Sequence, residues 1–189
     1  MLKRNVVPYA WLFSEIDIDP DAHVLEIGFG PGYGISTVLR RIAQGRGTIT
    51  GLDFSETMLK KVAAVAARDP ARDKVRLELG DAARMPFTDD SFDIVFAVNV
   101  IYFWKDLARC FKEARRVLRP GGIAVFYFTD AACLRALPLA ADRIFEFYTP
   151  AELQAAAIAA GFHPLQHLQK EVASKPVRIG HLLTAVKPE

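Results

Sequence analysis

The 189-residue chain has little cysteine and no long apolar run. Its two cysteines, Cys110 and Cys133, lie far apart and form no CxxC pair, which excludes a disulfide framework and favours a reducing compartment, the cytoplasm. No apolar stretch approaches the ~20 residues of a membrane-spanning helix, because the longest candidate, residues 94–104, contains Asn99. The apolar N-terminal segment does not predict a signal peptide, since acidic residues follow it directly and it has no small-residue cleavage site.

The chain also lacks an excess of charge of one sign. Its 24 lysines and arginines and 22 aspartates and glutamates give a formal net charge of +2 at pH 7. This balance argues against a protein that wraps nucleic acid, although a local basic patch is not excluded. Apolar residues make up 51% and charged residues 24%, which is typical of a globular chain and excludes a disordered one. Since the sequence has no repeat, low-complexity segment or linker, we expect a single domain over residues 1–189.

Short apolar runs alternate with helical patterns along the first two thirds of the chain. The expected strands are residues 24–27, 48–53, 75–79, 92–98 and 123–128, and the expected helices are residues 36–43, 104–118 and a helix capped by Ser55 that runs to Arg68. Strands that alternate with helices form parallel sheets with right-handed crossovers. The pattern therefore predicts an α/β, Rossmann-like, doubly wound sheet with helices on both faces.

The last third of the chain departs from this alternation. A capping-box pattern at residues 149–152 predicts a helix that ends at Gly161. Two apolar runs follow, around residues 162–172 and 177–186, and the segment between them is too short for a crossover helix. We therefore expect a C-terminal antiparallel hairpin that completes a mostly parallel, seven-stranded sheet.

The most informative segment is the glycine-rich loop after the first expected strand. Glycines at positions 28, 30, 32 and 34 let the backbone turn sharply and approach a ligand closely. Tyr33 and Ile35 break the GxGxxG dinucleotide fingerprint, which disfavours a nicotinamide-dependent oxidoreductase. Asp53 ends the second strand, where a carboxylate can accept hydrogen bonds from both hydroxyls of a ribose. The spacing favours a ligand site over the alternative, an unliganded turn and an aspartate that only caps the next helix.

Four segments, taken in order, form a specific set of motifs. They are residues 24–32 (VLEIGFGPG), 51–59 (GLDFSETML), 80–93 (GDAARMPF followed by SFD) and 117–122 (VLRPGG). These segments resemble motif I, the ribose-binding segment, the adenine loop with the fourth strand, and the turn before the fifth strand of class I S-adenosylmethionine-dependent methyltransferases. The subfamily resembled is that of small-molecule methyltransferases of the ubiquinone and menaquinone biosynthesis type. The resemblance implies S-adenosylmethionine as cofactor, no metal ion, and methyl transfer to a small-molecule acceptor, which it does not identify.

The resemblance also implies which residues bind the methionine part of the cofactor. The backbone of Gly28, Gly30 and Gly32 is expected to contact it. Glu26 is expected to hold the amino-acid end or the loop, directly or through water. A purely structural role for Glu26, with its carboxylate bonding the amides of the loop, is the alternative, and the two roles are compatible.

For the adenosine part, the resemblance implies a second group of residues. Asp53 is expected to accept the ribose hydroxyls, and Asp81 the adenine amino group. The Ala82 amide is expected to meet a ring nitrogen of the adenine. Phe54 and Met58 are expected to offer it apolar surface. The alternatives are core packing for Phe54 and Met58 and an Asx turn for Asp81.

Asn99 is polar within an apolar run at the end of the fourth strand, so we expect it to contact cofactor or substrate rather than to be a buried, satisfied amide. Tyr33, Tyr102, Trp104 and Tyr148 are the expected substrate-side residues, as pocket wall and not as catalysts. No catalytic residue is predicted, because orientation of the acceptor alone can supply ~7–11 kcal/mol. A general base is needed only if the acceptor must lose a proton.

Two short segments are expected to select the acceptor: an N-terminal cap (residues 1–22) and an insert (residues 129–149). Both carry apolar and aromatic side chains, which suit a lipid- or quinone-like acceptor. The same side chains would equally suit a homodimer contact. A non-catalytic cofactor-binding scaffold that needs a partner, and a methyltransferase acting on RNA or protein, are the alternative functions.

Two further patterns argue against other sites. The Asn-Pro-Pro-Tyr-like signature of enzymes that methylate the amino groups of bases is absent, since residues 98–102 read Val-Asn-Val-Ile-Tyr. His163 and His167 have metal-ligand spacing for a helix, but on the expected strand they would lie about 13 Å apart. The sequence therefore predicts neither a base-methylating enzyme nor a metal site.

Overall fold

The computed structural model describes residues 6–136, 145–172 and 178–189. Its centre is one sheet of seven strands in the order β3-β2-β1-β4-β5-β7-β6. The strands are β1 (His23–Ile27), β2 (Thr48–Asp53), β3 (Val75–Leu79), β4 (Phe92–Val98), β5 (Leu118–Thr129), β6 (Leu165–Val172) and β7 (Arg178–Val186). The first five strands are parallel, and β7 is antiparallel to both β5 and β6. The predicted fold class, including the C-terminal hairpin, is confirmed.

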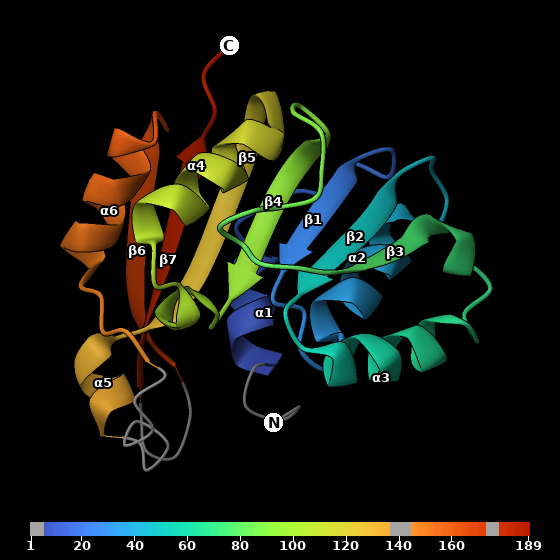
Figure 1. Ribbon diagram of the computed structural model, residues 1–189, viewed down its shortest axis with the longest axis horizontal. Helices are drawn as coiled ribbons and strands as arrows, with labels where there is room; N and C mark the ends of the chain where they lie inside the picture. Colours follow the sequence, from blue (N-terminus) through green and yellow to red (C-terminus); the bar gives the residue numbers. More distant parts are fainter. Residues whose placement is uncertain (1–5, 137–144, 173–177) are drawn as a thin grey trace.

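Helices cover both faces of the sheet (Figure 1). They are α1 (Val6–Leu12), α2 (Tyr33–Ile42), α3 (Glu56–Ala66), α4 (Leu107–Val117), α5 (Ala131–Arg135) and α6 (Pro150–Ala159). One buried apolar cluster joins α1, α2 and α3 to the sheet, and a second joins α4 and α6 to its other face. Strand β4 contributes Val95 to one cluster and Phe96 to the other, which explains its nearly continuous apolar sequence.

Two helix starts follow the sequence signals closely. The Ser55 hydroxyl accepts a hydrogen bond from the Met58 amide at 3.3 Å and caps α3. Thr149 and Glu152 form a complete capping box at the start of α6, with Pro150 in its first turn. These side chains satisfy backbone groups that the first helical turn leaves unpaired, and they can be recognised without tertiary information.

Two other predicted helix bounds were wrong. Helix α4 begins at Leu107 and not at Trp104, because the Asp106 carboxylate caps it by accepting a hydrogen bond from the Arg109 amide at 3.0 Å. The residues before it form a 3-10 turn, η3 (Ile101–Phe103). Helix α2 begins at Tyr33 and not at residue 36, because Gly32 is the N-cap, with a φ of 84°.

Strand β5 is longer than predicted. It begins at Leu118, which pairs with Phe92, and not at residue 123. The Gly121 amide donates to the Lys187 carbonyl at 2.8 Å, so the Pro-Gly-Gly segment stays attached to the C-terminal strand pair. Strand β6 starts only at Leu165, which places His163 before the strand on which it was expected.

The carboxyl ends of the parallel strands share one edge of the sheet. Helix α1 lies at this edge, where the arrows of β1 and β4 end (Figure 1). The expected cap segment is therefore partly helical, a feature too short to predict from periodicity. Residues 137–144 of the expected insert and the expected turn at 174–176 lie outside the described residues. Within the described ranges, no helix combines the length and apolarity needed to cross a membrane.

Candidate active site

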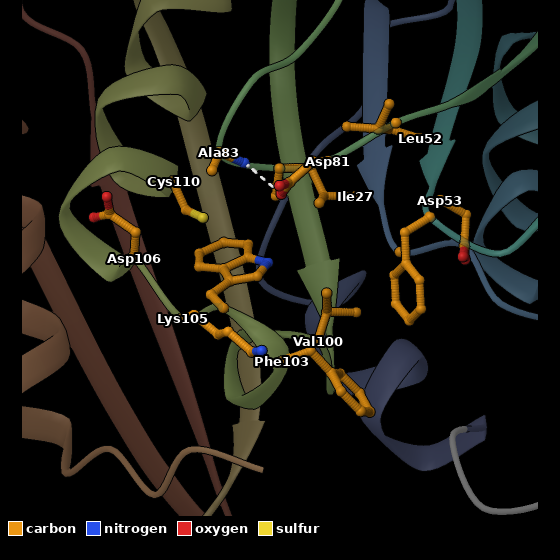
Figure 2. A pocket seen from close by; sticks show the side chains of 15 residues that line it. Ile27, Leu52, Asp53, Asp81, Ala83, Val100, Phe103, Lys105, Asp106 and Cys110 are labelled. Atoms are coloured by element: carbon orange, nitrogen blue, oxygen red, sulfur yellow. Dashed lines mark hydrogen bonds between the residues drawn. The ribbon is translucent and has the colours of Figure 1, made fainter. Parts of the chain in front are cut away.

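A cavity of about 540 Å³ lies at the carboxyl edge of the sheet. Its walls come from the ends of β1 and β2, the loop after β3 and the segment from Val100 to Cys110 (Figure 2). Six of the predicted site residues line it: Gly28, Asp53, Phe54, Asp81, Ala82 and Trp104. Small-molecule sites in proteins usually measure about 300–1,000 Å³, so this cavity is large enough for a nucleoside-containing ligand.

The loop after β1 needs glycine at Gly28 for two reasons. Its φ is +69°, a conformation that L side chains rarely adopt, and a Cβ there would collide with the Val100 side chain. Gly28 lines the cavity, whereas Gly30 and Gly32 do not. A Cβ on Gly30 would meet nothing within 4 Å, so this part of the loop borders open space.

Asp53 joins the glycine loop to the next helix. Its side chain is buried, one carboxylate oxygen accepts from the Gly30 amide at 2.9 Å, and the other accepts from the Ser55 amide at 2.9 Å. A carboxylate has about four acceptor positions, so two such bonds leave capacity for ligand hydroxyls. Asp53 therefore bonds to the start of the next helix, which was the structural alternative for it, and also lines the cavity.

Asp81 and Ala82 form the part of the cavity wall that follows β3. The Asp81 carboxylate accepts from the Ala83 amide at 2.9 Å, which is the predicted Asx-type alternative, and Asp81 also lines the cavity (Figure 2). Both features occur together, because an Asx turn engages one oxygen and leaves the other acceptor positions available.

Arg116 of α4 fastens this loop to the core. Its guanidinium donates two hydrogen bonds to Glu113 at 2.7 and 2.8 Å and one to Asp89 at 2.8 Å. It also donates to the carbonyls of Phe87 at 2.7 Å and Met85 at 3.1 Å. The hydrogen bonds from Arg116 lower the pKa of Glu113, which in turn accepts from the Met85 amide. The guanidinium of Arg116 therefore holds the segment from Met85 to Asp89, which follows Asp81 in the chain.

Replacing Arg116 with lysine is expected to weaken binding of S-adenosylhomocysteine, because an ammonium cannot reproduce the fork of bonds that holds the loop. We expect the dissociation constant to rise about fivefold and amide exchange in residues 80–91 to accelerate. Calorimetric titration and hydrogen exchange measure the two effects. Arg109→Lys, at an exposed position of the same helix, is the control. Unchanged exchange in R116K would contradict this role.

Glu26 is a fully buried carboxylate beneath the glycine loop. It accepts a hydrogen bond from the Tyr9 hydroxyl of α1 at 2.5 Å, and its second oxygen, Oε2, has no partner among the described residues. A Cβ on Gly34 would collide with this carboxylate, so glycine gives it room. Burial raises the pKa of Glu26 to about 8, although the bond from Tyr9 opposes this shift. A hydrogen bond from the backbone amide of Ile35, in the first turn of α2 directly after the loop, also opposes this shift, which is close to the expected structural alternative for Glu26.

Two further predicted cofactor residues, Met58 and Asn99, lie outside the cavity wall, as do Glu26, Gly30 and Gly32. Met58 packs against the apolar cluster under α1, α2 and α3, which is the core role weighed for it. Asn99 follows β4 with a φ of 57°, and its side-chain oxygen accepts from the Thr129 hydroxyl at 3.1 Å. This bond ties the end of β4 to the end of β5.

The predicted substrate-side residues are divided among three places. Trp104 lines the cavity. Tyr102 and Tyr148 line a much smaller pocket between η3, the end of β5 and the segment before α6, and the Tyr148 hydroxyl donates to the Trp104 carbonyl at 2.5 Å. Tyr33 packs against Tyr9, with ring centroids 5.1 Å apart.

Sequence reasoning missed Val100, Phe103, Lys105, Asp106 and Cys110, all of which line the cavity. The available signal was their position directly after β4, whose carboxyl end shares an edge with β1 and β2. Burial raises the pKa of the Cys110 thiol to about 12, so Cys110 is a neutral wall residue at neutral pH and not a nucleophile.

Two of the four histidines form a hydrogen-bonded chain with an aspartate. His167 of β6 lies 3.1 Å from His181 of β7, nitrogen to nitrogen, and His181 lies 3.2 Å from the Asp130 carboxylate that caps α5. Both ring nitrogens of His181 therefore face protein groups. Among the described residues, no group of histidine, cysteine, aspartate or glutamate side chains is arranged to hold a metal ion.

Comparison with known proteins identifies the family. Residues 25–126 match a family described as "Methyltransferase domain". The chain belongs to this methyltransferase family. The match runs from within β1 to Phe126 of β5, and it confirms the resemblance to S-adenosylmethionine-dependent methyltransferases and the predicted enzyme class.

Relatives of this methyltransferase act on different acceptors, judging from their names. A demethylmenaquinone methyltransferase of Desulfitobacterium hafniense is 36% identical over 58% of this chain and 43% of its own length. The sterol 24-C-methyltransferase ERG6B of Gibberella zeae is 35% identical over 62% of this chain and 30% of its own. The chain thus spans less than half the length of these two relatives.

Among solved structures, a sarcosine dimethylglycine methyltransferase from Galdieria sulphuraria, described as putative, has the same fold. Its TM-score is 0.82 at 15% identity, and the match covers 99% of this methyltransferase and 88% of that chain. At this identity the likeness concerns the fold alone.

Proposed function

We propose that this methyltransferase transfers a methyl group from S-adenosylmethionine to a small apolar acceptor. The observation that carries the proposal is the cavity in which Gly28, Asp53 and Asp81, from three different strand ends, meet. Ligands of open α/β sheets bind at the carboxyl ends of the strands. When bound there, S-adenosylmethionine would supply an electrophilic methyl group.

The residues at the cavity fit the adenosine part of this cofactor. Asp53 would accept from the ribose hydroxyls while it keeps its bonds to the loop and to α3. Asp81 would accept from the adenine amino group, and the Ala82 amide would donate to a ring nitrogen. Phe54, 70% exposed at the cavity wall, would cover the adenine with apolar surface. Met58 would support this wall from the core.

The glycine loop and Glu26 fit the amino-acid part. Gly28, Gly30 and Gly32 would let the loop backbone lie against it. The free oxygen of Glu26 would accept from the cofactor's ammonium group. A buried carboxylate oxygen without a partner is costly, so a cationic group beside it would stabilise the site as well as bind.

Catalysis in this proposal is by orientation. The wall would align the acceptor with the methyl group, and alignment alone is worth ~7–11 kcal/mol. Burial raises the pKa of Tyr102 and of Tyr148, so neither hydroxyl is set up to take a proton at neutral pH. An acceptor that needs no strong base, or that ionises by itself, suits this chemistry.

Aromatic side chains near the cavity favour an apolar acceptor. Phe54 and Phe103 lie with ring centroids 6.3 Å apart at the cavity, and Phe145 packs on Phe103 at 5.1 Å and on Tyr102 at 5.6 Å. We propose a quinone- or lipid-like acceptor, an inference that the menaquinone and sterol relatives also support. The other residues that we propose to lie near the acceptor or the cofactor are Asn99, Tyr33, Trp104 and Tyr148.

Thermal unfolding with added ligands tests this function. We expect S-adenosylhomocysteine and S-adenosylmethionine to raise the melting temperature by several degrees, and NAD to leave it unchanged, because saturating ligand adds about 2.7 kcal/mol at 100 times its dissociation constant. Product formation from demethylated quinones and sterols would then identify the acceptor class. Stabilisation by NAD alone would contradict the proposal, and cofactor binding without transfer to any acceptor would favour a scaffold that needs a partner.

A further inference from the structure

Trp104 carries a polar atom that the protein does not use. The side chain is only 4% exposed and lines the cavity, yet its indole nitrogen, Nε1, has no hydrogen-bond partner among the described residues. The other buried side-chain atoms in this condition are Glu26 Oε2 and Arg178 Nε. Since nine tenths or more of buried polar groups are paired in proteins, an unpaired donor in a cavity wall calls for a ligand acceptor.

The indole is held in place from several sides. Its ring packs edge-to-face against Phe111 and Phe126, each with a centroid distance of 5.8 Å. The Tyr148 hydroxyl donates to the Trp104 backbone carbonyl at 2.5 Å. A donor fixed in this way loses little conformational freedom when a ligand arrives, which favours selective binding.

No carboxylate of the cavity wall accepts a hydrogen bond from the indole. Asp106 accepts from the Arg109 amide as the cap of α4, and Asp81 accepts from the Ala83 amide. An indole N–H can only donate, so its partner must bring a lone pair into the cavity.

The position of Trp104 indicates which part of a ligand it meets. Trp104 shares one buried cluster with Ala82 and Cys110. Figure 2 shows Cys110 and Ala83 on the side of the cavity away from Asp53. In the proposed function, Asp53 holds the ribose and the Asp81–Ala82 segment holds the adenine, so Trp104 lies at the adenine end.

We propose that the Trp104 indole N–H donates a hydrogen bond to a ring nitrogen of the cofactor's adenine, which makes Trp104 a specificity-determining residue. The inference rests on the proposed function. Adenine has three ring nitrogens with in-plane lone pairs, N1, N3 and N7. The Ala82 amide and the Trp104 indole would engage two of them, so a base lacking the nitrogen that Trp104 pairs would leave this donor buried and unsatisfied.

Ligands that lack one ring nitrogen test the assignment. S-adenosylhomocysteine and its 1-deaza, 3-deaza and 7-deaza analogues are titrated into the wild type and into Trp104→Phe, which keeps an aromatic ring but removes the donor. We expect two analogues to bind the wild type more weakly than the parent. The analogue that lacks the nitrogen paired with Trp104 should bind the wild type about tenfold more weakly than the parent, but should bind W104F as tightly as the parent binds W104F. Trp11→Phe is the matched control, because the Trp11 indole donates to Glu15 at 3.0 Å, away from the cavity.

A spectroscopic measurement on the wild type keeps the test independent of how W104F folds. The chain has two tryptophans, so two indole N–H signals are expected in a ¹⁵N correlation spectrum, and W11F assigns them. The Trp104 signal should shift downfield with S-adenosylhomocysteine and less with the discriminating analogue. Equal binding of all analogues by the wild type, or an unmoved Trp104 signal in the saturated complex, would overturn the proposal. Failure of the wild type to bind S-adenosylhomocysteine would instead overturn the proposed function.

Discussion

Replacing Asp53 with asparagine is expected to raise the dissociation constant for S-adenosylhomocysteine by about 100-fold. In the wild type both carboxylate oxygens accept backbone amides, one from Gly30 in the loop and one from Ser55 at the start of α3. Asparagine keeps only one such oxygen, and its NH₂ group must face one of the two amide donors. The change therefore loosens the glycine loop and also removes an acceptor for the ribose. Calorimetric titration measures the loss.

The control for this effect is Asp69→Asn. The Asp69 carboxylate also accepts a backbone amide, that of Ala71 at 2.8 Å, in the turn after α3 and outside the cavity wall. Both variants lose one charged acceptor, so a general effect of charge on the chain would appear in both. Thermal unfolding without ligand separates loss of folding from loss of binding. If D53N binds S-adenosylhomocysteine as tightly as D69N does, Asp53 has no role in the site.

The parts of the site that could be predicted are those determined by local sequence. Gly28 and Asp53 each stand at the end of an apolar strand, and parallel strands bring their carboxyl ends to one edge. Asp81 follows a strand and a glycine, so it is also expected at this edge. The approximate bounds of the parallel strands follow from the alternation of elements, so these residues could be expected together from the sequence.

The residues that were missed depend on contacts between distant segments. Lys105 and Cys110 line the cavity on either side of the start of α4, and Asp106 caps this helix through one hydrogen bond. The hydrogen bond from Tyr9 to Glu26 joins a short helix to a strand across 17 residues of sequence, and no sequence periodicity predicts it. Such contacts depend on how helices pack on the sheet, which sequence patterns define only loosely.

Glu26 shows how the same packing links stability to function. Two groups that can carry negative charge lie close to it, Tyr9 from α1 and Asp53 from β2, and Tyr33 from α2 packs against Tyr9. On the other side, its neighbour on β4 is the apolar Phe96. Burial raises the pKa of Glu26 more than the hydrogen bonds from the Tyr9 hydroxyl and the Ile35 amide lower it, so Glu26 is protonated at neutral pH without a ligand. An ammonium group in the site would favour the ionised carboxylate instead.

Replacing Glu26 with glutamine is expected to stabilise the chain without ligand at pH 8 and above. The pKa of Glu26 is about 8 in the folded chain, against an ordinary value of 4.5. Between these values the folded chain holds a proton that the unfolded chain has lost. The free energy of unfolding of the wild type therefore falls as pH rises, by about 1.4 kcal/mol per pH unit from this group. Glutamine does not ionise, so E26Q lacks this decline.

Urea unfolding across this pH window, with and without S-adenosylhomocysteine, measures both sides of the effect. The stability of E26Q should exceed that of the wild type increasingly as pH rises, whereas the ligand should stabilise the wild type more than E26Q. Glu15→Gln is the matched control, because Glu15 also accepts from an aromatic residue of α1 but is exposed. Parallel pH profiles for E26Q and the wild type would mean that Glu26 ionises normally when buried. A ligand that stabilises both equally would mean that the carboxylate does not meet the cofactor's ammonium group. The two results are independent. A pH profile without the expected decline would not contradict the contact between Glu26 and the cofactor's ammonium group.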